Sequence, residues 1–210
     1  MKQVSLLNQI DFIEYGFYDA QDSQLSQNPI LMNQVHSADA LFIDKQLQSS
    51  PQVDALITNV SGLNLTVKTA DCAPILVVDT KAKLIAAIHA GWKGAFQGVI
   101  ENTILQMCEI GGDVLHMVAA VGPHLQKESF EADTQMYSLF PITEQHFFTE
   151  QTNGKFLFDF HQYVLHRLKR TGITQIDSVL IDTFTNNKYN SYRRDPKNPA
   201  RQYSSICLKD

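Results

Sequence analysis

The sequence predicts an α+β fold with a mixed or largely antiparallel sheet, and three observations support that prediction. Short β-branched and aliphatic runs bounded by turn residues recur along the chain, as in residues 74–79 and 84–88. Amphipathic helices are expected at residues 94–110 and 160–171. Proline and glycine are spread through the chain without a linker or a repeat, so we expect residues 1–210 to form a single domain.

The first half of the chain is a series of short candidate strands. Residues 11–20 are typical of an edge strand. Residues 30–44 indicate two strands around a turn at His36, and further strands are expected at residues 53–58 and 63–69. The two apolar runs named above follow, and an antiparallel pairing of them predicts a buried hairpin.

The second half alternates helices with strands. The helix at residues 94–110 carries an apolar stripe at helical spacing, and Gly111 is the expected stop. Cys108 lies on that stripe and is interpreted as an inert core thiol. The remaining expected elements are a strand at 114–123, a helix at 128–140, a hairpin at 147–160, the helix at 160–171, a strand at 176–184 and a closing strand that contains Cys207.

Composition narrows the class of protein. The chain has 210 residues, 44% of them hydrophobic and 19% charged, as in ordinary globular proteins. A net charge of −5 without a run of like charges argues against a nucleic-acid partner or an anionic membrane surface. There is no membrane-length apolar run and no signal-peptide pattern, and the three scattered cysteines suggest no disulfide framework. We therefore expect a reduced, cytoplasmic protein.

Three side chains with metal-ligand chemistry stand beside the ends of predicted strands. His36 lies at a turn, Cys72 just before the run at 74–79, and His89 just after the run at 84–88. The predicted hairpin brings Cys72 and His89 to the same end of the sheet. Three protein ligands with an open fourth position are typical of catalytic zinc, which lowers the pKa of a bound water. No short metal-binding motif connects the three residues, and each alone is as well explained by core packing or a backbone hydrogen bond.

The same atoms allow two other chemistries. Cys72 can act as a thiolate nucleophile with His89 as its base and Asp71 or His36 as the orienting partner, which is a metal-independent Cys–His hydrolase. A His2Cys set is also the ligand set of blue copper. A multicopper oxidase needs many more histidines than the seven in this chain.

The segment HAGWKG and the pair Arg193-Arg194 are candidate anion sites. Gly91 allows a close backbone approach, and the following helix start with Lys93 suits a phosphate. A plain strand-to-helix turn with Trp92 in the core explains the segment equally well. Adjacent arginines in a polar loop usually face solvent, so that pair is the weaker candidate.

Five segments resemble one family in the expected order. NQVHSADA, KTADCAPILVVD, AAIHAGWKGAFQGVIENTI, AAVGPHLQKESFE and SYRRDPKNPARQYSSICL are similar to the purine nucleoside phosphorylase family of laccase-domain, polyphenol-oxidase-like proteins (domain of unknown function 152). The resemblance extends from about residue 30 to the end of the chain. The order of TADC followed by HAGW is its most specific part.

The resemblance implies a fold, an activity and a cofactor. The implied fold is a layered α/β/β/α sandwich with mixed sheets, like cytotoxic-necrotizing-factor-like cysteine hydrolases. The implied cofactor is one zinc ion bound by His36, Cys72 and His89, with copper as the alternative. The implied reactions are phosphorolysis of adenosine, inosine and 5′-methylthioadenosine to the free base and a pentose 1-phosphate, and deamination of adenosine. Copper-dependent polyphenol oxidation and a Cys–His amidase acting on cell-wall peptides are the alternatives.

The resemblance also implies roles and partners. We expect Cys72, His89 and Asp71 to be catalytic, with Asp71 as an orienting group or proton carrier. Gln34 is expected to bind the base or ribose, and Lys93 and Arg194 the phosphate. The expected partners are a purine nucleoside and phosphate, with no nucleic acid or membrane, and the expected state is a monomer or weak homodimer.

The chain departs from the family pattern in places that bear on substrate preference. Lys93 stands where the family more often has arginine, which keeps the charge but loses the bidentate fork. Ala200 replaces a common glycine, and HLQKESFE replaces a cysteine-containing segment.

Overall fold

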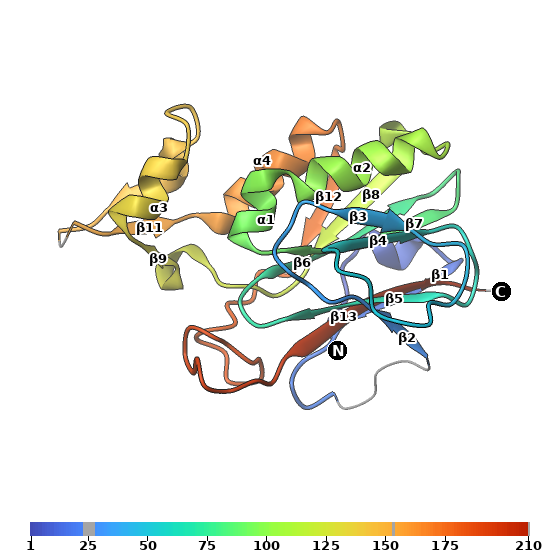
Figure 1. The fold of residues 1–210 in the computed structure, drawn as a ribbon, viewed down its shortest axis with the longest axis horizontal. Coiled ribbons are helices and arrows are strands. Elements are labelled where there is room, and N and C mark those ends of the chain that lie inside the picture. The colour runs from blue at the N-terminus through green and yellow to red at the C-terminus, as the bar shows by residue number, and fades with distance from the viewer. Residues whose placement is uncertain (23–27, 153, 210) are drawn as a thin grey trace.

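Two sheets pack face to face in the computed structural model, which describes residues 1–22, 28–152 and 154–209 (Figure 1). The larger sheet contains, in spatial order, β12 (Gln175–Ser178), β8 (Met117–Val121), β6 (Ala73–Asp79), β7 (Leu84–Ala90), β4 (Ala55–Thr58) and β3 (Ala40–Phe42). The smaller contains β1 (Ile13–Phe17), β13 (Gln202–Leu208), β5 (Asn64–Thr69) and β2 (Pro29–Leu31). Both sheets are mixed, as predicted, because β12–β8, β3–β4 and β2–β5 are parallel pairs.

Helices cover one face of the larger sheet. They are α1 (Trp92–Gln97), α2 (Val99–Glu109) and α4 (Phe160–Arg170) (Figure 1). A separate three-stranded sheet of β10 (Phe148–Glu150), β11 (Phe156–Phe158) and β9 (Glu131–Ala132) lies beside them with α3 (Thr134–Leu139). Tyr137 of α3 stacks on Phe156 of β11, with ring centroids 4.1 Å apart.

The hairpin of β6 and β7 forms the centre of the molecule. Every residue of both strands is buried, which explains their continuous apolar sequences. Ile75 and Ile88 belong to the core under the helices, whereas Leu76 and Ala87 belong to the core between the two sheets. The antiparallel pairing predicted for residues 74–79 and 84–88 is confirmed.

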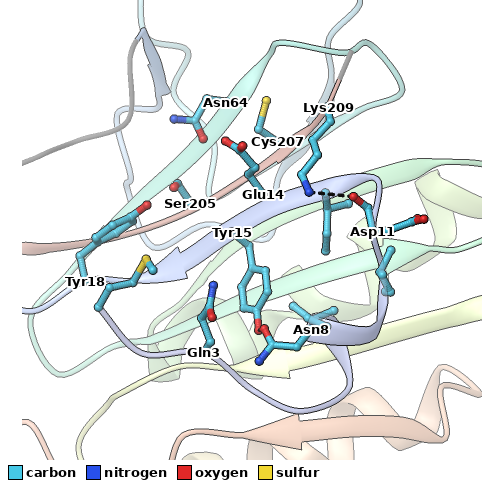
Figure 2. A pocket seen from close by; sticks show the side chains of 14 residues that line it. Gln3, Asn8, Asp11, Glu14, Tyr15, Tyr18, Asn64, Ser205, Cys207 and Lys209 are labelled. Carbon is cyan, nitrogen blue, oxygen red and sulfur yellow. Dashed lines mark hydrogen bonds between the residues drawn. The ribbon is translucent and has the colours of Figure 1, made fainter.

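The outer helical layer of the expected α/β/β/α sandwich is not found in the described residues. No α-helix covers the outer face of the four-stranded sheet there (Figure 1). A cavity of about 420 Å³ lies along the edge strand β1 and is lined from both faces of that strand, by Glu14 on one side and Tyr15 on the other (Figure 2). On the outer face, Glu14 lies beside its cross-strand partner Cys207, and Asn64 and Ser205 lie near them. A face with this polar lining does not require a helix to bury it, so three layers replace the predicted four.

Several predicted elements differ in extent. The helix expected at 94–110 is divided at Gly98, which has a left-handed φ of 105°. Only residues 134–139 of the segment 128–140 are α-helical, because the Asp133 carboxylate caps the helix by accepting from Met136 N–H at 2.7 Å. The strand expected at 176–184 ends at Ser178. Its continuation is a turn in which the Asp182 carboxylate accepts Phe184 N–H at 3.0 Å.

The other predicted elements are present. The expected edge strand at 11–20 is β1, which lies at the edge of its sheet. The hairpin at 147–160 contains the antiparallel pair β10–β11. The two strands expected within 30–44 exist, but β2 and β3 belong to different sheets. None of the described helices is long and apolar enough to cross a membrane.

Candidate metal centre

The β6–β7 hairpin brings Cys72 and His89 together. Pro74 is the cross-strand partner of His89, and Cys72 directly precedes β6. The chain enters β6 through Asp71, which has a φ of 82°. The His89 side chain is only 4% exposed, whereas Cys72 is half-buried. The predicted convergence of these two side chains is therefore found.

His36 completes the group from a separate loop. It lies between β2 and β3 with a φ of 60°, a left-handed conformation that is uncommon for a non-glycine residue. Its ring centroid is 4.9 Å from that of His89, and the two planes meet at 66°. One ligand atom from each of His36, Cys72 and His89 lies within 4.8 Å of the other two. No other group of this kind is found among the described His, Cys, Asp and Glu residues.

The donor set fits a tetrahedral metal ion. Zinc bonds of about 2.0–2.3 Å place neighbouring ligand atoms roughly 3.5 Å apart, so small side-chain rotations would close the group. The Nδ1 of His89 is 2.7 Å from Asp54 Oδ1. That contact directs Nε2, the other ring nitrogen, to a ligand. The three residues can thus hold one metal ion of soft or borderline character and leave the fourth tetrahedral position open.

Charge around His89 decides its proton affinity. Burial lowers its pKa, but the interactions with Cys72 and the hydrogen bond to Asp54 outweigh burial and raise the pKa to about 9. Burial, followed by the charge of His89, lowers the pKa of His36. A metal ion that binds through His89 must therefore displace a firmly held proton, so metal binding is expected to release protons.

A cavity of about 860 Å³ opens over these residues. Aromatic rings and cationic side chains share its lining, together with the three candidate ligands. The aromatic rings are Trp92, Phe130, Phe160 and Tyr192, and the cations are Lys68, Lys93, Arg193 and Arg201. Apolar walls with a few convergent charges are typical of small-molecule sites.

Gln34 and Lys93 line this cavity, as predicted for substrate-binding residues. The Gln34 amide donates to the Lys68 carbonyl at 2.7 Å and accepts from the Lys68 N–H at 2.9 Å. The Lys93 ammonium lies 5.6 Å from the centre of the Trp92 ring. Their roles in substrate binding stay predictions.

The Asp71 carboxylate joins two loops beside the cavity. Oδ1 accepts from the Thr183 hydroxyl at 2.7 Å, and Oδ2 accepts from Arg193 N–H at 2.6 Å. These bonds favour the orienting role over that of a proton carrier, because both oxygens already have donors.

Arg194 does not fit its predicted phosphate role. Its guanidinium donates to the carbonyls of Thr183 at 2.9 Å, Phe184 at 2.7 Å and Tyr189, and the residue does not line the cavity. The neighbouring Arg193 does line it. Sequence alone could not separate the two, since the loop conformation decides which of two adjacent arginines faces inward.

Residues 19–209 match the family model described as multi-copper polyphenol oxidoreductase laccase. The chain belongs to this laccase-like family. A purine nucleoside phosphorylase of Rickettsia prowazekii is 33% identical over 174 residues, which are 80% of this chain and 72% of that protein. An adenosine deaminase of an unknown prokaryotic organism is 38% identical over 101 residues, 48% of this chain and 38% of that protein.

A solved structure supports the same family. The Neisseria meningitidis protein of the DUF152 family is 31% identical and superposes with a TM-score of 0.80, covering 87% of this chain and 75% of that one. The family resemblance predicted from the sequence is thereby confirmed. The likeness to cysteine hydrolases of the cytotoxic-necrotizing-factor type stays a prediction.

The "multi-copper" part of the laccase-like family name has no counterpart in the described residues. They contain one candidate metal group, His36, Cys72 and His89. Several copper ions would need several such groups.

Sequence reasoning missed Asp54 and the phenylalanines of the cavity. Asp54 is fully buried directly before β4. The acidic residue within the apolar run VDALIT could have indicated a buried carboxylate. Such a group needs several hydrogen-bond donors around it. Phe130 and Phe160 gave no local signal. They meet at the cavity, with ring centroids 5.5 Å apart, only through the packing of α4.

Proposed function

We propose that the protein is a zinc-dependent purine nucleoside enzyme. It phosphorolyses adenosine, inosine and 5′-methylthioadenosine to the free base and a pentose 1-phosphate, and it also deaminates adenosine. The names of its relatives, a purine nucleoside phosphorylase and an adenosine deaminase, support this class of substrate. Asp71, Cys72 and His89 are the proposed catalytic residues, and His36, Cys72 and His89 the proposed zinc ligands.

One observation carries the proposal. The His36, Cys72 and His89 group lies in the same 860 Å³ cavity as aromatic rings and cations. A purine needs flat apolar walls for stacking, and phosphate needs cationic donors. A zinc ion held by the three residues would supply Lewis acidity at its open position.

Phosphorolysis sets clear demands on the chain's own residues. A phosphate oxygen bonds to C1′ while the C1′–N9 bond breaks, and the electron pair stays on the purine, which then takes up a proton. Lys68, Lys93, Arg193 and Arg201 are the proposed groups that hold the phosphate against C1′. Gln34 is proposed to bind the base or ribose. Trp92 and Tyr192, the more exposed aromatic rings of the cavity, are the proposed stacking surfaces for the base. Deamination instead places a water at the purine C6 and releases ammonia.

Product analysis tests the proposal. Zinc-loaded protein is incubated with adenosine, with and without phosphate, and the products are separated. Adenine that forms only with phosphate supports phosphorolysis, and inosine formed without phosphate supports deamination. Metal analysis of protein purified without chelator distinguishes zinc from copper. Absence of both products in zinc-loaded protein contradicts the proposal.

Two arginines test where the phosphate lies. Both guanidinium groups donate to loop carbonyls, but Arg201 lines the cavity and Arg194 does not. We expect Arg201→Ala to raise the KM for phosphate at least tenfold, because loss of one charge-assisted contact costs about 1.5–3 kcal/mol. Arg194→Ala is the matched control and is expected to lower the melting temperature with little change in that KM. The reverse pattern would restore the original assignment of Arg194.

A second candidate function follows from the position of Asp54. His89 lies between Cys72 and Asp54, which is the order of nucleophile, base and orienting group in a thiol hydrolase. We propose as the alternative a metal-independent amidase acting on cell-wall peptides. Rapid alkylation of Cys72 in chelator-treated protein, with retained amidase activity, favours this alternative. Loss of all activity with the chelator and its return with zinc excludes it.

A further inference from the structure

One buried carboxylate contacts the segments of both candidate histidine ligands. Asp54 Oδ1 accepts from His36 N–H at 3.1 Å and lies 2.7 Å from His89 Nδ1. Oδ2 accepts from Val35 N–H at 3.2 Å and from Ser37 N–H and hydroxyl at 2.7 and 3.0 Å. Asp54 is 0% exposed.

Only a carboxylate suits this environment. Five donors converge on two oxygens, and a carboxylate has about four acceptor sites and no proton to place among them. The backbone carbonyl of Asp54 adds a sixth contact, because it accepts His89 N–H at 2.7 Å. A buried charge of this kind is retained when it is fully hydrogen-bonded.

We propose that Asp54 is the positioning residue of the metal centre, which fixes His36 and His89 in the geometry that binds the ion. The proposal rests on the proposed metal function of the His36, Cys72 and His89 group. Asp54 touches neither the ion nor the substrate; it acts through the two histidines.

The action on His89 is a choice of ring nitrogen. The contact with Oδ1 holds a proton on Nδ1, so that Nε2 is the ring nitrogen left to bind an ion. An ion bound by Nε2 would then also be within reach of the Cys72 sulfur.

The action on His36 concerns the backbone. The left-handed φ of 60° at His36 is unfavourable for a residue with a Cβ. Bonds from three consecutive N–H groups, at Val35, His36 and Ser37, compensate for that conformation. Without them the loop would relax and carry the imidazole away from Cys72.

Asp54→Asn separates a positioning role from a purely structural one. The amide has a single acceptor oxygen, so it can serve either the loop N–H groups or His89, but not both. We expect zinc affinity, measured by competition with a chromophoric chelator, to fall roughly 10- to 100-fold. The visible spectrum of the Co²⁺-loaded protein is expected to change shape as the ligand geometry loosens.

Asp79→Asn is the matched control. Asp79 is equally buried, accepts from Lys81, Ala82 and Asp113 N–H groups, and pairs with Leu84 at the opposite end of the β6–β7 hairpin. It should lower stability while leaving zinc affinity and the Co²⁺ spectrum unchanged. Asp54→Glu is the second variant, to be used if Asp54→Asn does not fold. It keeps the buried negative charge and is therefore expected to fold. It should still weaken zinc binding, because the longer side chain displaces both histidines.

The outcomes are distinct. Zinc affinity in Asp54→Asn and Asp54→Glu within twofold of the unaltered protein, with unchanged Co²⁺ spectra, would overturn the positioning role and leave the proposed function standing. An equal loss of affinity in Asp79→Asn would also overturn it, since a general structural effect would then suffice. Failure of the unaltered protein to bind zinc would overturn the proposed function and this inference together.

Discussion

At the scale of single residues, the metal group depends on a missing side chain. A Cβ built on Gly91 would lie 2.5 Å from His36 Nδ1 and 3.2 Å from Cys72 Sγ. The Gly91 backbone, with φ −75° and ψ 161°, is one that alanine adopts readily. Glycine is therefore needed here for the space beside the ligands and not for its conformational freedom.

We predict that Gly91→Ala weakens zinc binding at least tenfold and changes stability little. The added methyl group occupies the position of the His36 ring, which must turn away from Cys72. Chelator competition measures the affinity, and thermal unfolding in excess chelator measures the stability. Unaltered zinc affinity in the variant would show that His36 is not confined as the structure indicates.

His124 should make stability depend on acid pH. It is fully buried; its Nδ1 donates to the Gly122 carbonyl at 2.7 Å, and its Nε2 is 3.2 Å from the Gln126 amide nitrogen. Burial lowers its pKa to about 4 from the ordinary 6.5. Between these pH values the unfolded chain binds the extra proton, so the free energy of unfolding falls as pH drops from 6.5 to 4.

We predict that His124 contributes a loss of up to about 3 kcal/mol over that interval. His124→Gln, which has no titrating group, should flatten the fall in urea-unfolding free energy between pH 6.5 and 4. His146→Gln, a change at an exposed histidine, is the control and should leave the slope unaltered. Equal slopes in the His124 variant and the unaltered protein would contradict the prediction.

Sequence reasoning located the metal group but not its surroundings. Cys72 and His89 could be placed together because they stand at the ends of two strands predicted to pair, whereas the family resemblance was needed to add His36. The role of the Asp54 carboxylate could not be predicted from strand ends, since its five donors come from residues 35–37 and from His89. Likewise, only the folded loop shows that Arg201 lines the cavity and Arg194 does not, since both guanidinium groups donate to loop carbonyls.

At the scale of elements, the division of one expected helix into α1 and α2 has a single cause. The apolar stripe from Phe96 to Met107 is continuous in sequence, and periodicity therefore predicts one helix. Gly98 interrupts it with a φ of 105° and ψ of 25°, while its N–H still bonds the Gly94 carbonyl at 3.0 Å. The spacing of hydrophobic residues does not reveal a change of backbone conformation at a single residue.

We predict that Gly98→Ala destabilises the protein by about 1–2 kcal/mol, the cost of a left-handed residue with a Cβ. Steric crowding adds little, because the nearest atom to a new Cβ is 3.8 Å away. Gly98→Asn should cost less, since asparagine tolerates this conformation better. Chemical denaturation of the two variants measures the difference. An alanine variant as stable as the unaltered protein would mean that α1 and α2 can join into one helix.

At the scale of the whole molecule, two candidate ligands lie where the chain passes between the sheets. His36 lies between β2 of the four-stranded sheet and β3 of the six-stranded sheet, and Cys72 lies between β5 and β6 of the same two sheets (Figure 1). His89 is part of β7 in the larger sheet. The individual strands were predictable from sequence, but their distribution between two sheets was not, because it depends on long-range pairing such as β13 with β5.

This position couples metal binding to the stability of the whole fold. An ion shared by His36, Cys72 and His89 would link both crossings to the central hairpin, and the unfolded chain cannot hold the three side chains together. We therefore predict that zinc stabilises the protein by about 4 kcal/mol at a thousandfold excess over its Kd. Cys72→Ala should abolish this gain, whereas Cys108→Ala, which removes a thiol on α2, should keep it. Urea unfolding with zinc and with chelator measures both; an equal zinc effect in Cys72→Ala would place the stabilising ion elsewhere.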